Sequence, residues 1–159
     1  MEERISDEEL TEFVRRTEQA ADAWVRGDMA TYLDVIHHAQ GFTLLAPFGG
    51  PATQHDERAD SIRASADYFQ GGEARLEHVY THAWGDTVVL VMIERQHGQV
   101  GGLPDQDLSL RVTQVYRRDG ADWLLVHRHA DPLVQTLELE RLAALLRGRA
   151  PEPGPPPGQ

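Results

Sequence analysis

Apolar residues recur at helical spacing near the start of the chain. The positions three or four residues apart are Leu10, Phe13, Val14, Thr17, Ala21, Trp24 and Val25. Ser6 with Glu9 three residues later has the spacing of a capping box, and Gly27 follows the last apolar position. The pattern predicts a helix between Ser6 and Gly27.

The next segments are shorter. Asp28 can cap a second helix whose apolar positions include Met29 and Tyr32, and residues 42–48 are typical of a short strand. Thr53, with Asp56 three residues later, predicts the start of a third helix, which we expect to end at Gly71 and Gly72.

From residue 73 onward the spacing changes to that of strands. Residues 73–84 alternate weakly, Gly85 and Asp86 mark a turn, and residues 87–93 are apolar at almost every position, as expected of a strand covered on both faces. Residues 108–117 and 123–130 are two more strands, which Asp119 and Gly120 join as a hairpin.

Asp131 and Pro132 predict the start of a last helix, which carries Leu137, Leu142, Leu145 and Leu146. We expect a single domain over residues 1–148 and a disordered tail, rich in proline and glycine, over residues 149–159. Helices followed by a run of antiparallel strands indicate an α+β fold with the helices on one face of a sheet. The sequence lacks βαβ alternation and a phosphate-binding glycine motif, which argues against a Rossmann fold.

Composition narrows the classes of function. With 159 residues and a formal net charge of −11, the chain is a single acidic domain, so we expect no binding to nucleic acid and none to an anionic membrane. The sequence has no cysteine and no apolar run near the ~18 residues of a membrane span. We therefore expect a cytoplasmic protein.

The element order resembles the nuclear transport factor 2-like superfamily, specifically its SnoaL-like and ketosteroid-isomerase-like branch. The sharpest part of the resemblance runs from Leu110 through Arg117, Arg118, Asp119 and Gly120 to Trp123 and residues 126–129. It is also similar to the association domain of calcium/calmodulin-dependent protein kinase II. The resemblance implies a cone, in which a strongly curved antiparallel sheet wraps the helices and leaves a pocket at its open end. It also implies a homodimer paired through the convex face.

Glu94 is the first candidate for chemistry. By strand alternation it shares a face with Val88, Leu90 and Met92, and a carboxylate among apolar walls is suited to general base catalysis. The alternative is that the strand ends at Ile93 and Glu94 meets solvent. The resemblance directs Arg111 and Thr113 into the cone as well, where Arg111 can stabilise an oxyanion and Thr113 can orient a ligand. Arg111 can equally form a surface ion pair.

His127 and His129 lie two residues apart and so project to one side of their strand, together with Trp123 and Leu125. Imidazole is a natural proton shuttle. A two-residue turn at Asp119 and Gly120 places these histidines with Leu110 and Val112, whereas a three-residue loop places them with Arg111 and Thr113. Both registers stay open, as does packing of the histidines in a dimer interface.

Tyr32 completes the candidates, with a hydroxyl at the pocket mouth that binds the ligand. Although His127 and His129 are a possible chelate, a third ligand at defined spacing is absent, so we expect no metal, and no cofactor motif is present.

The favoured function is proton transfer on a compact apolar carbonyl or hydroxyl compound, by isomerisation, cyclisation or dehydration. The alternative is a ligand-binding or dimeric assembly module without catalysis.

Overall fold

The computed structural model describes residues 4–147, so the tail expected from residue 149 onward lies outside the described residues. The helices are α1 (Asp7–Arg26), α2 (Met29–Val35), α3 (Ala59–Ala64) and α4 (Leu139–Leu146), with a 3₁₀ turn at Ala66–Tyr68. The strands are β1 (His37–Leu45), β2 (Thr53–His55), β3 (Phe69–Trp84), β4 (Thr87–Val100), β5 (Gln106–Asp107), β6 (Leu110–Asp119) and β7 (Asp122–Pro132).

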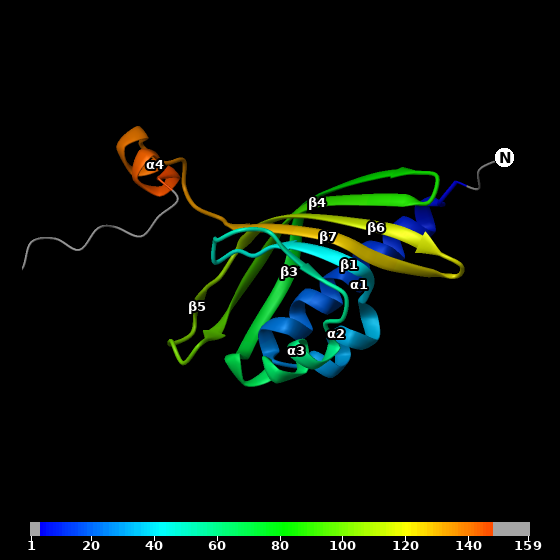
Figure 1. Cartoon of the computed structure of the whole chain (residues 1–159), viewed down its shortest axis with the longest axis horizontal. Coiled ribbons are helices and arrows are strands. Elements are labelled where there is room, and N and C mark those ends of the chain that lie inside the picture. The colour runs from blue at the N-terminus through cyan, green and yellow to red at the C-terminus, as the bar shows by residue number, and fades with distance from the viewer. Residues whose placement is uncertain (1–3, 148–159) are drawn as a thin grey trace, which may run out of the picture.

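The strands form one curved sheet in the order β2-β1-β7-β6-β4-β3, with the short β5 paired to β4. The helices α1, α2 and α3 lie against its concave face (Figure 1). This is the α+β architecture that the sequence predicts, with one difference: β1 and β7 are parallel, so the sheet is mixed. Both strands start at the same end, where His37 pairs with Leu124, because α2 delivers the chain to the beginning of β7.

The two N-terminal helices begin as the sequence predicts. Ser6 and Glu9 form both bonds of the capping box, and Gly27 ends α1 in the left-handed conformation at φ 79°. Asp28 caps α2 through the N–H of Thr31. The side chain of Phe13 on α1 then packs edge-on against Tyr116, with ring centroids 4.5 Å apart, which fixes the helix to the sheet.

The end of α1 meets β3 and β4 at a contact that only glycine permits. A Cβ atom on Gly72 would lie 2.2 Å from the carbonyl oxygen of His97 and 2.8 Å from that of Val25. Backbone therefore packs directly on backbone where the helix ends.

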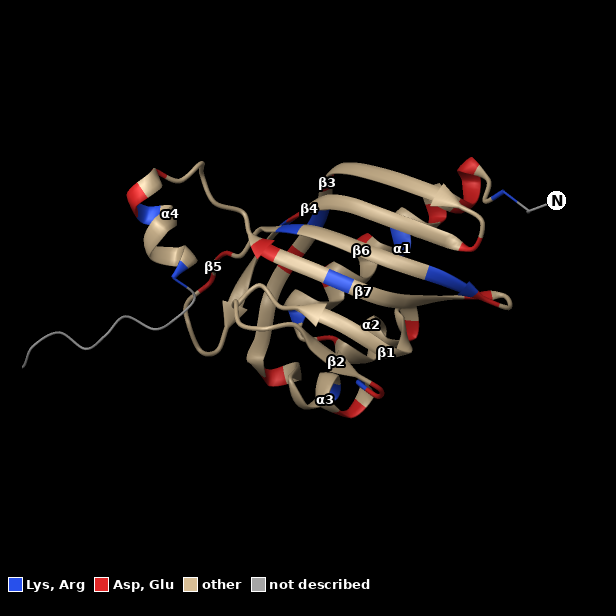
Figure 2. Cartoon of the chain, turned by 45° about the horizontal axis from the view of Figure 1, so that its top comes forward, with Lys and Arg blue, Asp and Glu red and all other residues tan. Residues whose placement is uncertain are grey.

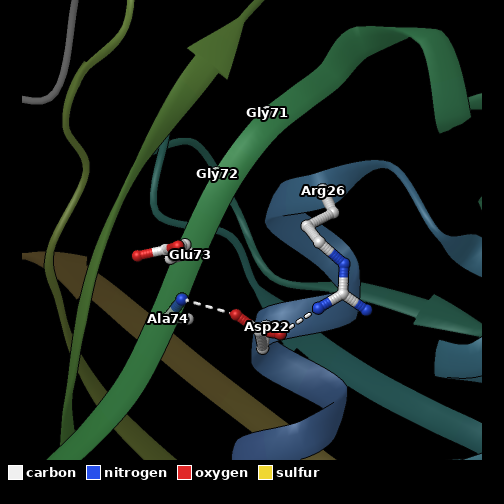
Figure 3. Close-up of a pocket in the computed structure, with 6 residues that line it drawn as sticks. All are labelled: Asp22, Arg26, Gly71, Gly72, Glu73 and Ala74. Carbon is white, nitrogen blue, oxygen red and sulfur yellow. Dashed lines mark hydrogen bonds and ion pairs between the residues drawn. The ribbon is translucent and has the colours of Figure 1, made fainter.

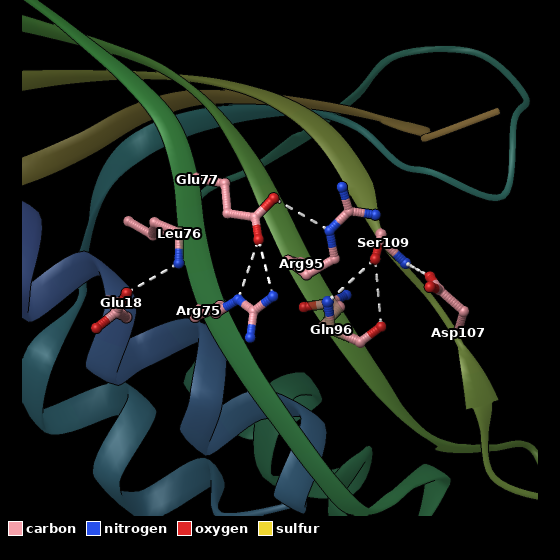
Figure 4. A network of polar contacts seen from close by, with 8 residues as sticks. All are labelled: Glu18, Arg75, Leu76, Glu77, Arg95, Gln96, Asp107 and Ser109. Carbon is pink, nitrogen blue, oxygen red and sulfur yellow. Dashed lines mark hydrogen bonds and ion pairs between the residues drawn. The ribbon is translucent and has the colours of Figure 1, made fainter. Parts of the chain in front are cut away.

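The helix α1 also covers the free edge of β3, whose unpaired N–H groups would otherwise be open to another strand. Asp22 accepts a hydrogen bond of 3.0 Å from the N–H of Ala74 and pairs with Arg26 (Figure 3). One turn earlier, Glu18 accepts a bond of 2.9 Å from the N–H of Leu76 (Figure 4). Carboxylates from the helix thus take the place of a neighbouring strand.

Two predicted helices differ from the structure. The segment from Thr53 begins with β2, paired to β1, and only residues 59–64 are α-helical, because tertiary pairing overrides the local capping pattern at Thr53. Asp131 and Pro132 belong to β7, which pairs with β6 as far as Leu110. The last helix, α4, starts later at Leu139 and stands away from the sheet (Figure 1).

Charge is spread over the described chain, with acidic and basic residues interspersed along the elements (Figure 2). Among residues 4–147, no helix combines the length and the apolar character that a membrane crossing requires.

Candidate functional site

Strand alternation assigns the β4 side chains to two faces. Val88, Leu90, Met92 and Glu94 point to the concave face and are buried, while Val89, Val91 and Ile93 point to the convex face. Glu94 is only 3% exposed. The strand continues to Val100, so Glu94 lies inside the strand rather than at its end.

Glu94 forms a two-bond ion pair with Arg128 of β7, in which the two guanidinium nitrogens donate to the two carboxylate oxygens at 2.7 and 2.9 Å. One fifth of the Arg128 side chain is exposed. Burial acts to lower the pKa of Arg128, but the charge of Glu94 and its hydrogen bonds outweigh burial and raise the pKa. Arg128 therefore stays positively charged beside the Glu94 carboxylate.

Tyr32 and His38 form a second polar pair beside the first, with the hydroxyl oxygen of Tyr32 3.2 Å from Nε2 of His38. Burial raises the pKa of Tyr32 to about 12, so its hydroxyl stays protonated. Burial, reinforced by Arg58, lowers the pKa of His38 to about 4. The imidazole is therefore neutral at pH 7.

Arg58, in the turn that precedes α3, is the least satisfied group of the site. Its Nε atom is buried and has no hydrogen-bond partner in the part of the chain that the structure describes. The guanidinium carbon lies 5.4 Å from the ring centroid of Phe42, a cation–π contact. Burial lowers the pKa of Arg58, and the charge of Arg128 lowers it further.

We call these five residues, Tyr32, His38, Arg58, Glu94 and Arg128, the concave cluster. Its floor is supported by Tyr116, which donates a hydrogen bond of 2.8 Å to the side chain of the buried Gln114. The pKa of Tyr116 is raised by burial, so this hydroxyl also stays protonated. The concave cluster thus combines a forked ion pair, a protonated phenol, a neutral imidazole and a buried cation.

Two of the six site residues predicted from the sequence, Tyr32 and Glu94, lie in the concave cluster. The other four lie on the opposite face of the sheet: Arg111, Thr113, His127 and His129. The expectation that Arg111 and Thr113 face into the cone beside Glu94 is wrong. Arg111 pairs with Ile93, the convex neighbour of Glu94, because β4 and β6 are in plain antiparallel register.

The histidines are on the convex face for a different reason. The β6–β7 loop consists of residues 120 and 121, and a bulge at Val126 lies between the pairs Tyr116–Leu125 and Val115–His127. The bulge reverses the alternation, so His127 and His129 share a face with Arg111 and Thr113 but not with Leu125 or Trp123. The prediction that His127 and His129 project to the same side as Trp123 and Leu125 is wrong.

On the convex face three of the four predicted residues, Arg111, His127 and His129, interact with neighbouring side chains. His127 shares a hydrogen bond of 2.7 Å with Thr43, and Asp131 lies 3.2 Å from His129 and 3.3 Å from Arg111, whose side chain is 62% exposed. Arg111, His129 and Asp131 border a shallow hollow of about 440 Å³. Its lining includes His78, Tyr80, Val91, Arg111, Thr113 and His129. Arg111 and His129 are exposed, and both lie next to Asp131.

Three members of the concave cluster were missed. Arg128 alternates with His127 and His129, so its strand position alone puts it on the face opposite theirs. Neither His38 nor Arg58 carries a sequence signal for this site, and the place of Arg58 depends on the turn between β2 and α3. Within residues 4–147, no group of three or more His, Asp or Glu residues is arranged to hold a metal ion.

The other hollow, between the end of α1 and β3, has a volume of about 560 Å³ (Figure 3). Asp22, its central carboxylate, is already bonded to the N–H of Ala74 and to Arg26. No buried polar atom among its described lining residues lacks a partner. The concave cluster, where Arg58 does lack one, is the stronger candidate.

Solved structures with the same fold include three from different organisms. A "putative dehydratase" of the NTF2-like family from Streptomyces avermitilis is 21% identical over 81% of this chain and 99% of its own, with a TM-score of 0.66. An NTF2-like protein of unknown function from Pseudomonas putida KT2440 is 18% identical over 86% and 93%, with a TM-score of 0.65. The association domain of C. elegans CaMKII is 16% identical over 78% and 95%, with a TM-score of 0.60.

A search of curated proteins gives no match. A family model described as the SnoaL-like domain matches residues 15–135, which include every member of the concave cluster. The chain therefore belongs to the SnoaL-like family, and its fold is the one seen in NTF2-like proteins.

Proposed function

We propose that the protein binds a compact, mostly apolar small molecule at the concave cluster and transfers a proton on it, by isomerisation, cyclisation or dehydration of a carbonyl or hydroxyl compound. The observation that carries the proposal is the buried Nε–H of Arg58, which has no acceptor among the described residues. A buried donor without a partner is costly, and a ligand oxygen is a natural acceptor.

The surroundings fit an apolar ligand with a polar end. Leu76 and Leu110 flank Glu94 on the neighbouring strands, and Leu44 pairs with Arg128. All three leucines are only partly buried, so they offer apolar surface next to the polar groups.

Glu94 is the proton acceptor that we propose. Each of its oxygens accepts one bond from Arg128 and keeps a second lone pair. Proton abstraction moves negative charge from this carboxylate to a substrate oxygen. If that oxygen lies near Arg128 and Tyr32, the same positive charge and the phenol hydroxyl stabilise it, which offsets the cost of neutralising Glu94.

His38 is a poor base, because its pKa of about 4 means that the imidazole holds a proton weakly at pH 7. We assign it the role of holding the Tyr32 hydroxyl, from which it lies 3.2 Å away. In this proposal the four convex-face residues, Arg111, Thr113, His127 and His129, take no part in the proton transfer, because the sheet separates them from Glu94.

A second proposal concerns the convex face, where we infer that two copies pair as a homodimer. Tyr80 is 62% and Val91 38% exposed there, beside the shallow hollow. Large exposed apolar side chains at the centre of a sheet face are typical of interaction surfaces. The similarity in fold to an association domain agrees with this inference.

The proton-transfer proposal is tested with a set of small ketones, aldehydes and hydroxy compounds. Compounds that raise the melting temperature are incubated with the protein in D₂O, and proton NMR follows the loss of C–H signals next to the carbonyl. Exchange proportional to protein concentration is the expected result. If compounds bind but none exchanges or reacts, the concave cluster is a binding site without catalysis, and if none binds, the assembly module is the better description.

A further inference from the structure

We propose that the substrate of the concave cluster is an anion, a compact apolar carboxylic acid whose carboxylate is bound by Arg58. This inference rests on the proposed function and narrows it to one substrate class.

The charges of the concave cluster do not balance. Arg58 and Arg128 are cations, whereas Glu94 is the only acidic member and is engaged by Arg128 through both oxygens. His38 is neutral at pH 7, and Tyr32 is protonated. One positive charge, that of Arg58, is therefore left over, and none of the ion pairs among the described residues includes it.

The neighbours of Arg58 make this imbalance stronger. Burial is the main cause of the lowered pKa values of Arg58, His38 and His55. The charge of Arg128 lowers the pKa of Arg58 further, against an opposite effect of Tyr32, and the charge of Arg58 lowers the pKa of both histidines further. These smaller contributions place a second cation close to Arg58. The chain as a whole has a formal net charge of −11, so this positive region is a local feature of the site.

The Nε–H edge of the Arg58 guanidinium is buried and has no partner among the described residues. Phe42 faces the cation in a contact that adds no negative charge and uses no N–H group. The Nε–H that lacks a partner lies on the side of the guanidinium that, with a neighbouring Nη–H, binds a carboxylate through two parallel bonds. A single carbonyl oxygen would fill only one of these positions.

The same charges orient the ligand. Glu94 repels a second carboxylate, whereas Arg58 attracts it, so the acid group lies at Arg58 and the reacting carbon lies toward Glu94 and Tyr32. In this orientation one cation anchors the substrate and the other, Arg128, remains paired with the proton acceptor.

The test compares the binding of a set of compact apolar carboxylic acids with the binding of their primary amides. Each amide has a shape similar to that of its acid and no charge. Calorimetric titration of the wild-type protein should show the acid binding at least about tenfold more tightly than the amide. Arg58→Gln should abolish this preference and Arg58→Lys should restore part of it. Arg111→Gln, at an exposed arginine on the other face, should leave it unchanged.

Three outcomes overturn the inference. Equal binding of acid and amide to the wild-type protein leaves the proposed function standing and refutes the substrate class, and this comparison needs no variant to fold. A preference that survives in a folded Arg58→Gln protein, as judged by circular dichroism, assigns the anion to another residue. Binding of neither compound, across the whole set, refutes both the inference and the proposed function.

Discussion

Glu94 and Arg128 form a forked ion pair although their strands are not neighbours in the sheet. The strand β6 lies between β4 and β7. In the ladder, Glu94 is next to Leu110, whereas Arg128 is next to Gln114, so the side chains meet diagonally across the concave face. The pair Val112–Ala130 lies between them, and both residues are small and buried. One ion pair thus links three strands at the candidate site.

Arg128→Met should lower the free energy of unfolding by about 2–4 kcal/mol. Removing one partner leaves the charge of Glu94 buried, which typically costs ~3–5 kcal/mol, and the partial exposure of Arg128 reduces this cost. Urea unfolding at pH 7 measures this change in the free energy of unfolding.

The double variant Glu94→Leu/Arg128→Met should be more stable than the sum of the two single changes predicts, because no charge is left unpaired. The control is Arg111→Met, which breaks an exposed pair with Asp131 and should change the stability by less than about 1 kcal/mol. If Arg128→Met lowers the free energy of unfolding no more than this control does, the buried pair contributes nothing to the stability of the fold.

The stability of the protein should fall between pH 7 and pH 5, in part because of His38. The unfolded chain binds a proton on this imidazole near its ordinary pKa of 6.5, whereas the folded protein does so only at about 4. Between these values the unfolded state holds more protons, so acidification favours unfolding, by about 1–2 kcal/mol at pH 5. Urea unfolding at both pH values should show a smaller loss in His38→Gln than in the wild-type protein.

His97 should affect the pH dependence of stability in the opposite direction to His38. Hydrogen bonding to Asp105 raises the pKa of His97, so its contribution is present at low pH and is lost as the pH rises through the raised value. His97→Gln should therefore steepen the acid-induced loss of stability. If His38→Gln leaves the pH dependence unchanged, the imidazole of His38 is not buried in its neutral form.

Asp22→Ala should destabilise the protein by about 1–2 kcal/mol, because the N–H of Ala74 loses its charged acceptor at the edge of β3. Glu12→Ala is the matched control on the same helix, since Glu12 bonds only its own neighbour Arg15 at the surface. Thermal unfolding compares the two variants. Equal melting temperatures would contradict a role of the helix carboxylates in covering the sheet edge.

Val91→Glu should convert the proposed homodimer into a monomer, because it places a charge in the centre of the convex face. Sedimentation equilibrium at micromolar concentration measures the mass. The control Leu146→Glu changes an exposed leucine on α4, away from the sheet, and should leave the dimer intact. A wild-type protein that is monomeric under these conditions would refute the dimer outright.

The sequence predicts the face of Glu94 because β4 and β6 pair without a bulge from Thr87 to Glu94, so simple alternation holds. The same reasoning fails on β7, where one extra residue at Val126 reverses the alternation. A bulge of this kind depends on pairing with both neighbouring strands, and no local residue pattern marks it here.

Arg58 shows a second limit. Its place beside Phe42 depends on β2 folding back onto β1, and the capping pattern at Thr53 and Asp56 points to a helix instead. The capping box at Ser6 and the N-cap at Asp28 are predicted correctly because neither segment competes for a strand partner. Residues near the turns of the sheet are therefore where the sequence is least informative about this site.

The face of the sheet that carries the chemistry is tested most directly by proton exchange into a bound compound in D₂O, followed by NMR for Glu94→Gln and His129→Gln. These two residues lie on opposite faces. We expect a loss of ~10²–10⁴ in the exchange rate for Glu94→Gln, a far smaller loss for Tyr32→Phe, and an unchanged rate for His129→Gln. A folded Glu94→Gln protein that exchanges at the wild-type rate, or a loss confined to His129→Gln, would contradict the assignment of proton transfer to the concave face.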